Sequence, residues 1–137
     1  MATLVDSNIL IDVLNVGSSW GEWSFRKLGD VRREGPIVIN QLVLAELSAG
    51  FFTRAQLDDA LDADSFQRED IPWDAAFLAG QAFRQYRRSG GEKTSPLPDF
   101  YIGAHALVRG YRLISRDVRR YRAYFPDLEL IAPDTHP

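Results

Sequence analysis

The sequence contains no cysteine, and this absence removes two classes of site. Without thiols the chain can form neither disulfide bonds nor thiolate metal centres. It also lacks any apolar run long enough to span a bilayer, and its first residues do not have the basic-then-apolar layout of a secretory signal. These absences predict a cytoplasmic protein that does not enter a membrane.

Histidine is scarce as well. The 137 residues include only two, His105 and His136, and His136 falls in a carboxyl-terminal tail that we expect to be frayed. An imidazole-rich metal site and a ribonuclease mechanism that uses two histidines are therefore disfavoured. His105 could be proposed as a general base, but a lone histidine among small residues is more often structural.

Charge is distributed unevenly along the chain. The first 79 residues carry 6 basic and 13 acidic side chains, whereas residues 80–137 carry 10 basic and 6 acidic ones. Arginine outnumbers lysine by 14 to 2, and arginine is the better bidentate phosphate ligand. A GC-rich genome gives the same arginine bias without a functional cause. The segregation of charge is therefore the more informative feature.

Short apolar runs alternate with helical patterns along the whole chain, which is long enough for one domain with a substantial core. This alternation predicts a single domain over residues 1–137, an α/β protein with a three-layer α/β/α sandwich and a mainly parallel central sheet. We expect strands at 3–5, 36–39, 111–114 and 128–132, a short extended piece within 65–71, and helices after Ser7 or Asn8 and at 20–33, 41–49, 53–63, 74–88, from 98 and at 118–124.

Two acids directly follow predicted strands. Asp6 ends the apolar run 3–5, and Asp117 comes just after the run 111–114. The carboxyl ends of parallel strands meet at one edge of the sheet, where open α/β sheets bind ligands. We therefore expect these two carboxylates to lie close together.

Two further acids fall on helices that leave this edge. Glu46 lies between Leu42 and Val43 on the predicted inward face of the helix 41–49. The simpler alternative for Glu46 is a buried ion pair with an arginine. Asp99 follows Pro98 in the first turn of a helix, where a cap is the alternative, but it shares a face with small residues that would let this helix approach the sheet closely.

Four converging carboxylates would repel one another unless a cation lay between them. With no cysteine and one structured histidine, all-oxygen ligation favours Mg²⁺ or Mn²⁺. Such a site predicts hydrolysis of phosphodiesters. Nearby arginines could hold a phosphate backbone, with a solvated or partner-facing basic surface as the alternative. The arginines that we predict to bind RNA are Arg116, Arg119, Arg120 and Arg122.

In these features the chain resembles the PIN-domain ribonucleases, and within them the VapC toxins of type II toxin–antitoxin pairs. The resemblance covers essentially the whole chain, and none of the four acids that it requires is missing. The matching pieces are Val5-Asp6-Ser7-Asn8, Glu46 within 43–47, Leu97-Pro98-Asp99, Ser115-Arg116-Asp117 and the ending 119–126.

The resemblance implies a Mg²⁺- or Mn²⁺-dependent endoribonuclease toxin, commonly acting on tRNA or ribosomal RNA. Its catalytic metal ligands would be Asp6, Glu46, Asp99 and Asp117, supported by Asn8 and Ser115. It also implies a homodimer and a VapB-like antitoxin whose carboxyl-terminal segment occupies the active-site groove, with a higher assembly of the two. Aromatic residues that could serve these interfaces, or else pack in the core, are Trp20, Trp23, Phe51 and Phe52.

Other classes of function fit less well. A haloacid-dehalogenase-like phosphatase needs an aspartate two residues after the first one, and that position is Asn8. The alternative from a different class is a non-catalytic PIN-fold module that binds protein or RNA. Such a degenerate member would be expected to have lost one of the acids.

Overall fold

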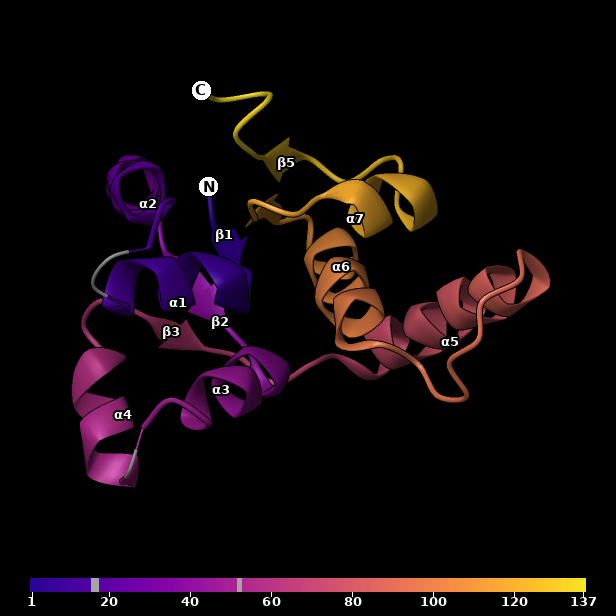
Figure 1. The fold of residues 1–137 in the computed structure, drawn as a ribbon, viewed down its shortest axis with the longest axis horizontal. Coiled ribbons are helices and arrows are strands. Elements are labelled where there is room, and N and C mark those ends of the chain that lie inside the picture. The colour runs from indigo at the N-terminus through magenta and orange to yellow at the C-terminus, as the bar shows by residue number, and fades with distance from the viewer. Residues whose placement is uncertain (16–17, 52) are drawn as a thin grey trace.

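The computed structural model describes residues 1–15, 18–51 and 53–137. Phe52, one of the aromatic residues predicted for an interface, lies outside them. Within the described ranges, the centre of the fold is a five-stranded sheet in the order β3-β2-β1-β4-β5, and every neighbouring pair of strands is parallel (Figure 1). The strands are β1 (Thr3–Val5), β2 (Ile37–Ile39), β3 (Gln67–Arg68), β4 (Arg112–Ile114) and β5 (Leu130–Ile131).

Helices join these strands and cover both faces of the sheet. They are α1 (Ser7–Leu14), α2 (Gly21–Glu34), α3 (Gln41–Ser48), α4 (Arg54–Ala60), α5 (Trp73–Arg88), α6 (Pro98–Arg109) and α7 (Arg119–Tyr124). Right-handed crossovers place α1 to α4 on one face and α5 to α7 on the other, which is the grouping seen in Figure 1. The predicted α/β/α sandwich is confirmed. No helix in the described ranges is long and apolar enough to cross a membrane.

The central strands are short, and they are buried on both faces. β1 and β2 are buried along their whole length, and Leu4 of β1 pairs with Val38 on one side and Leu113 on the other. Strands covered on both faces are expected to read as continuous apolar runs rather than as alternating patterns. This is why three apolar residues were enough to mark the first strand.

Side-chain caps mark the starts of α1, α3 and α4. Asn40 caps α3 as predicted, because its Oδ1 accepts hydrogen bonds from the backbone nitrogens of Leu42 and Val43 at 3.0 and 3.2 Å. The expected cap of α1 was wrong, since Asp6 itself takes this position and accepts from the Ser7 nitrogen at 2.8 Å. Asp6 has extended backbone angles, so α1 begins immediately after β1.

His105 has the structural role that its isolation predicts. It is fully buried, and the Asn40 amide contacts its Nδ1 at 3.0 Å while its Nε2 lies 2.9 Å from Glu69 Oε1. With the Asn40 amide donating to Nδ1, Nε2 carries the proton and donates to Glu69. Burial alone would raise the pKa of Glu69, but hydrogen bonds from His105 and Tyr111 and the charge of Arg109 lower it.

The aromatic residues proposed for an interface divide between core and surface. Trp23 is buried, and its Nε1 donates to the backbone oxygen of His136 at 2.9 Å, which fits the core-packing alternative. Trp20 is exposed and meets Trp23 edge to face. Phe51 is half-buried beside a hollow between α3 and α4.

Gly103 of α6 packs against α7, not against the sheet as the small residues of this helix had suggested. A Cβ added at Gly103 would lie 2.6 Å from Phe125 Cδ2 and 3.0 Å from Tyr121 Cδ1. We expect Gly103→Ala to lower the free energy of unfolding by about 1–3 kcal/mol, because the two rings must shift.

Chemical denaturation measures this change, and Gly29→Ala is the matched control. A Cβ at Gly29 in α2 meets only the flexible end of Arg33 at 3.8 Å, so that variant should be slightly stabilised by its better helix propensity. Equal stability of the two variants would contradict the close packing of α6 on α7.

Candidate active site

Asp6 is the most tightly held acid at the carboxyl edge of the sheet. It is 4% exposed, and its Oδ2 accepts hydrogen bonds from the Tyr121 hydroxyl at 2.7 Å and the Ser115 hydroxyl at 2.9 Å. Burial raises the pKa of Asp6 to about 6, although both hydrogen bonds oppose that rise. The charges of Asp99 and Glu46 raise it further, so these two carboxylates lie near Asp6.

Tyr121 is a site residue that the sequence analysis did not identify. It comes from α7, is almost fully buried, and donates to Asp6 across 115 positions of the chain. Burial and the negative charge of Asp6 raise the pKa of its hydroxyl well above the usual value, so Tyr121 stays protonated and acts as a donor. No local spacing links Tyr121 to Asp6, and only the family-like ending at 119–126 could have drawn attention to it.

Asn8 and Ser115 connect the ends of β1 and β4, where they were predicted to support the acids. The Asn8 amide donates to Ser115 Oγ at 3.0 Å, and its Oδ1 accepts from the Arg116 backbone nitrogen at 3.3 Å. Ser115 Oγ also accepts from the Asp117 backbone nitrogen at 3.2 Å. The segment that carries Asp117 is therefore fastened to the same polar network that holds Asp6.

Glu46 reaches this network from α3, but its predicted burial is wrong. Val43 and Leu47 are buried, whereas the Glu46 residue as a whole is exposed, because this short helix turns that position toward the rim. Partial burial of its carboxylate and the charge of Asp99 still raise its pKa, while a hydrogen bond from the Ser7 side chain lowers it. Among the described residues no lysine or arginine pairs with Glu46, so the structure does not support the ion-pair alternative.

Asp99 and Asp117 border one pocket of about 400 Å³. Asp99 is one-third exposed in the first turn of α6, and its Oδ2 accepts from Arg120 Nη1 at 3.1 Å, so it is more than a helix cap. Asp117 is exposed at the rim of the pocket. The residues that line this acidic pocket are Tyr86, Asp99, Asp117, Arg119, Arg120, Ala123 and Tyr124.

Three of the four arginines predicted to bind RNA are paired with carboxylates. Arg120 contacts Asp99 as above, and Arg122 makes two hydrogen bonds of 2.7 Å to Asp134. Arg116 Nε donates at 2.8 Å to Asp12, a buried acid that also accepts from the Ser24 hydroxyl. Arg119 is exposed and lines the acidic pocket.

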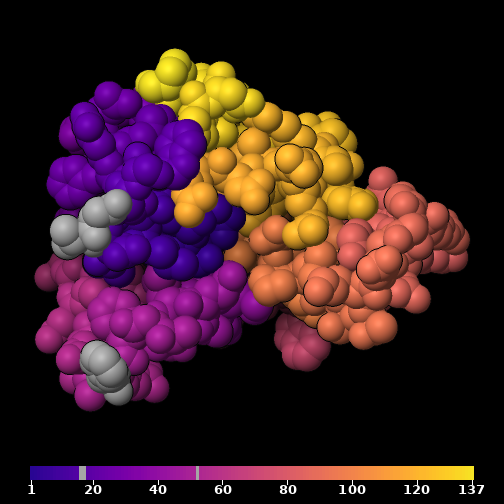
Figure 2. Space-filling view, viewed as in Figure 1, coloured from indigo at the N-terminus to yellow at the C-terminus, as the bar shows by residue number. Residues whose placement is uncertain are grey.

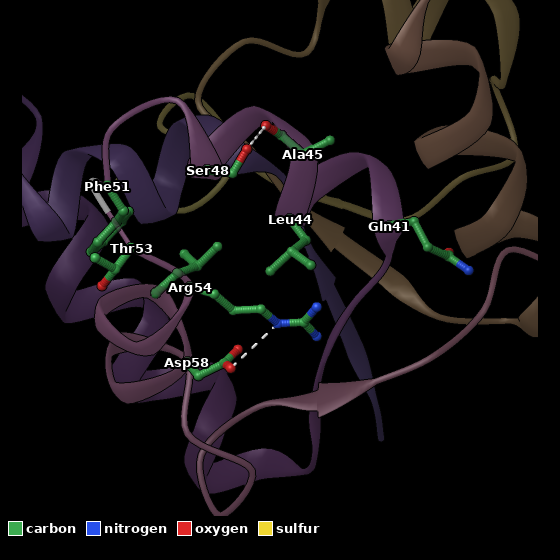
Figure 3. Close-up of a pocket in the computed structure, with 9 residues that line it drawn as sticks. Gln41, Leu44, Ala45, Ser48, Phe51, Thr53, Arg54 and Asp58 are labelled. Atoms are coloured by element: carbon green, nitrogen blue, oxygen red, sulfur yellow. Dashed lines mark hydrogen bonds and ion pairs between the residues drawn. The ribbon is translucent and has the colours of Figure 1, made fainter.

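A second hollow, between α3 and α4, lacks comparable chemistry. Figure 3 shows the residues that line it. The acid among them, Asp58, is paired with Arg54, whose Nε lies 3.5 Å from Asp58 Oδ2. Ser48 donates to the backbone oxygen of Ala45 at 2.8 Å, so its hydroxyl is already engaged. We therefore place the candidate active site at the acidic pocket and Asp6.

The donors at this site fit a hard divalent cation by their chemistry. The charge of Asp99 raises the pKa values of Asp6 and Glu46, and the charge of Glu46 also raises that of Asp6. All three side chains offer only oxygen ligands, which suit Mg²⁺ or Mn²⁺. Within the described ranges, however, no three Asp, Glu or His side chains already converge as a finished metal site, and Arg120 holds one oxygen of Asp99. Asp6, Glu46 and Asp99 are coupled by their charges, while Asp117 joins them through Ser115 and the shared pocket.

The chain matches the model of one protein family. Residues 3–126 match the PIN domain, which is most of the sequence and includes all four predicted acids. No sequence among the curated proteins matches the chain.

Solved structures with the same fold include several toxin–antitoxin complexes. VapBC2 from Rickettsia felis, bound to a DNA fragment from its promoter, is 20% identical with a TM-score of 0.74 and covers 96% of this chain and 98% of that one. FitAcB from Neisseria gonorrhoeae is 19% identical, with a TM-score of 0.72 and coverage of 98% and 99%. VapC20 from Mycobacterium tuberculosis, a toxin that cleaves the sarcin–ricin loop, is 17% identical, with a TM-score of 0.61 and coverage of 88% and 94%.

Proposed function

Because the chain belongs to the PIN domain family, we propose that it is a Mg²⁺- or Mn²⁺-dependent endoribonuclease and the toxin of a toxin–antitoxin pair. The observation that carries the proposal is the coupling of Asp6, Glu46 and Asp99. Placing three like charges near one another, with Asp6 buried, is unfavourable in a protein without a use for them. A nuclease has such a use, because it must hold a cation beside a phosphate.

Each residue has a distinct part in the proposed reaction. Asp6, Glu46, Asp99 and Asp117 would hold the ion, which supplies a Lewis acid for the phosphoryl oxygen and lowers the pKa of water. Tyr121, Ser115 and the Ser7 nitrogen keep the Asp6 carboxylate in one orientation. Asn8 holds the segment 115–117 against β1, so that Asp117 faces the pocket from a fixed loop.

Arg119 and Arg120 suit the binding of the RNA backbone. Both line the acidic pocket, and arginine forms bidentate contacts with phosphate. Arg116 and Arg122 do not line this pocket and are engaged by Asp12 and Asp134, so we expect them to contribute less to the binding of RNA. The RNA would be tRNA or ribosomal RNA, and the support is the similarity of fold to VapC20, a toxin that cleaves the sarcin–ricin loop.

We propose two protein partners for the cytoplasmic toxin. One is a VapB-like antitoxin whose carboxyl-terminal segment occupies the acidic pocket. The support is the similarity of fold to the toxin–antitoxin complexes. The other is a second copy of the chain, giving a homodimer that assembles further with the antitoxin. The antitoxin would inhibit the toxin by covering the acids that hold the ion.

Removal of metal tests the enzymatic proposal. We expect the purified chain to cleave RNA with Mg²⁺ or Mn²⁺, to lose that activity in EDTA, and to regain it when the ion is restored. Sequencing of the cleaved RNA ends measures the reaction and identifies the substrate.

The competing proposal is a non-catalytic PIN-fold module that binds protein or RNA. The ion pair between Arg120 and Asp99 favours it, since that arginine occupies an oxygen that a metal ion would need. If RNA binds the chain but stays intact with either ion, including in an Arg120→Ala variant that frees Asp99, this module is the better description.

A further inference from the structure

A buried hydrogen bond joins the two helices that carry Glu46 and Asp99. It runs from the Asn40 amide at the start of α3 to His105 Nδ1 in α6, over 3.0 Å. Asn40 is 3% exposed and His105 is fully buried, so water does not reach the bond. The two helices pack against each other, and in the space-filling view of Figure 2 the magenta segment with α3 meets the orange segment with α6. Loss of this bond would leave buried polar groups without a partner.

The cap of α3 leaves the Asn40 side chain one group for this bond. Its Oδ1 accepts hydrogen bonds from the backbone nitrogens of Leu42 and Val43, so the amide nitrogen is free to donate to His105. The same side chain therefore fixes the first turn of α3 and connects that turn to α6.

Glu69, just after β3, decides which nitrogen of His105 can accept. Its Oε1 lies 2.9 Å from His105 Nε2, and the carboxylate also accepts from Arg109 at 3.0 Å and from the Tyr111 hydroxyl at 2.7 Å. Because a carboxylate only accepts, Nε2 carries the proton and Nδ1 receives the Asn40 amide. The imidazole is thus held at both nitrogens.

The bond lies equally far along the two helices from an acid of the candidate active site. Glu46 comes six residues after Asn40, and Asp99 comes six residues before His105, which is about 9 Å of helix in each case. Partial burial raises the pKa of Glu46 and the charge of Asp99 raises it further, so the two acids lie near each other. A shift of α3 against α6 would therefore change the separation of these acids.

We propose that Asn40 and His105 are positioning residues, which hold α3 against α6 so that Glu46 and Asp99 bind the same cation. The inference rests on the function proposed above, because it concerns the same metal site. Ligands of a metal must be placed to within about 0.2 Å. Since α3 has only eight residues, of which Val43 and Leu47 are buried, its orientation depends strongly on the bond at its start.

The other side-chain contacts at the start of α3 lie at the surface. Gln41 donates to Asp70 at 2.8 Å and accepts from the Ile71 backbone nitrogen at 3.1 Å. Gln41 is exposed, so water can replace these bonds at little cost. They also join α3 to the segment before α5, and not to the helix that carries Asp99.

Two substitutions of His105 separate its bond to Asn40 from its bond to Glu69. Asparagine places an acceptor oxygen near the position of Nδ1, whereas glutamine places a donor near the position of Nε2. We expect His105→Asn to keep most of the affinity for Mn²⁺ and His105→Gln to lose about tenfold or more, the usual effect of a change behind metal ligands. Titration calorimetry with Mn²⁺ measures both affinities.

A residue that only stabilises the fold would lower the affinity for Mn²⁺ in proportion to stability. His105→Asn removes more volume than His105→Gln and leaves a cavity beside Glu69, so urea denaturation should find it at least as destabilised. The variant with the larger loss of stability should thus bind the metal better. If affinity instead follows stability, or if the two variants bind Mn²⁺ equally, the proposal is wrong.

Asn40→Ser tests the other side of the bond. Serine caps a helix about as well as asparagine, but it has no amide to reach His105. We expect this variant to lose about tenfold in affinity for Mn²⁺ with unchanged helix content by circular dichroism. Gln41→Ala is the matched control and should bind Mn²⁺ like the unchanged protein. An equal loss in both variants would contradict a special role for the bond to His105.

Amide hydrogen exchange keeps this inference separate from the nuclease proposal. The backbone hydrogens of Leu42 and Val43 bond to Asn40, so they should exchange faster in His105→Gln than in His105→Asn, with or without metal. If the unchanged chain binds no Mn²⁺, the proposed function fails, and this difference alone decides whether the bond fixes α3. Equal exchange in the two variants would overturn the inference.

Discussion

Asp6→Asn is expected to reduce RNA cleavage by on the order of 10³-fold or more and to abolish growth toxicity, because a lost metal site removes several kcal/mol of transition-state stabilisation. Asp6 is the acid that the other residues of the site contact or influence by their charge. Two hydroxyls and a backbone nitrogen hold its carboxylate, and the charges of Glu46 and Asp99 act on it. Asparagine keeps the shape of the side chain but not its charge.

The measurement is the rate of cleavage of a labelled RNA at saturating Mn²⁺, with circular dichroism to check the fold. Asp99→Asn should behave like Asp6→Asn, and both variants should still bind the antitoxin. Asp59→Asn, at an exposed position of α4, is the matched control and should cleave at the rate of the unchanged protein. Full activity in Asp6→Asn would remove Asp6 from the mechanism.

The metal-free protein should lose stability as the pH rises from about 4 to about 7. The pKa of Asp6 in the folded state is raised from 3.8 to about 6, so the folded protein binds more protons than the unfolded chain between these values. The free energy of unfolding therefore falls with rising pH through this window. The full penalty, about 3 kcal/mol, is present above pH 6 and absent below 3.8.

Other acids add to or oppose this trend, so the variant Asp6→Asn is needed as a reference. The raised pKa of Glu46 acts in the same direction as that of Asp6. The lowered pKa of Glu69 acts in the opposite direction, because its stabilisation is lost as the pH falls. Urea denaturation across this pH range should show Asp6→Asn gaining stability relative to the unchanged chain as the pH rises. A difference that does not vary with pH would contradict the burial of Asp6.

Local sequence patterns were sufficient to predict the order of the helices and strands and the edge of the sheet at which the acids lie. Asp6 and Asp117 follow apolar runs, and the carboxyl ends of parallel strands must meet, so no long-range information was needed. Asn40 and Pro98 set helix starts by their own chemistry, as caps and first-turn residues do.

The remaining features of the site depend on contacts between distant segments, which the periodicity of the sequence cannot predict. Glu46 was placed inward by a helical wheel, which cannot tell that α3 is short and ends at the rim. The bonds of Tyr121 to Asp6 and of Arg116 to Asp12 join segments more than 100 residues apart. The exposure of Trp73 was also hidden, because a wheel reports which residues share a face but not which face is covered.

Anomalous diffraction from crystals grown with Mn²⁺ tests the central claim most directly, because it locates the ion without reference to activity. We predict a manganese peak at the acidic pocket, bound by Asp6 with Glu46 and Asp99 and bordered by Asp117, and no such peak in Asp6→Asn. Crystals of the unchanged chain with no manganese there, and with Arg120 still bound to Asp99, would contradict the account.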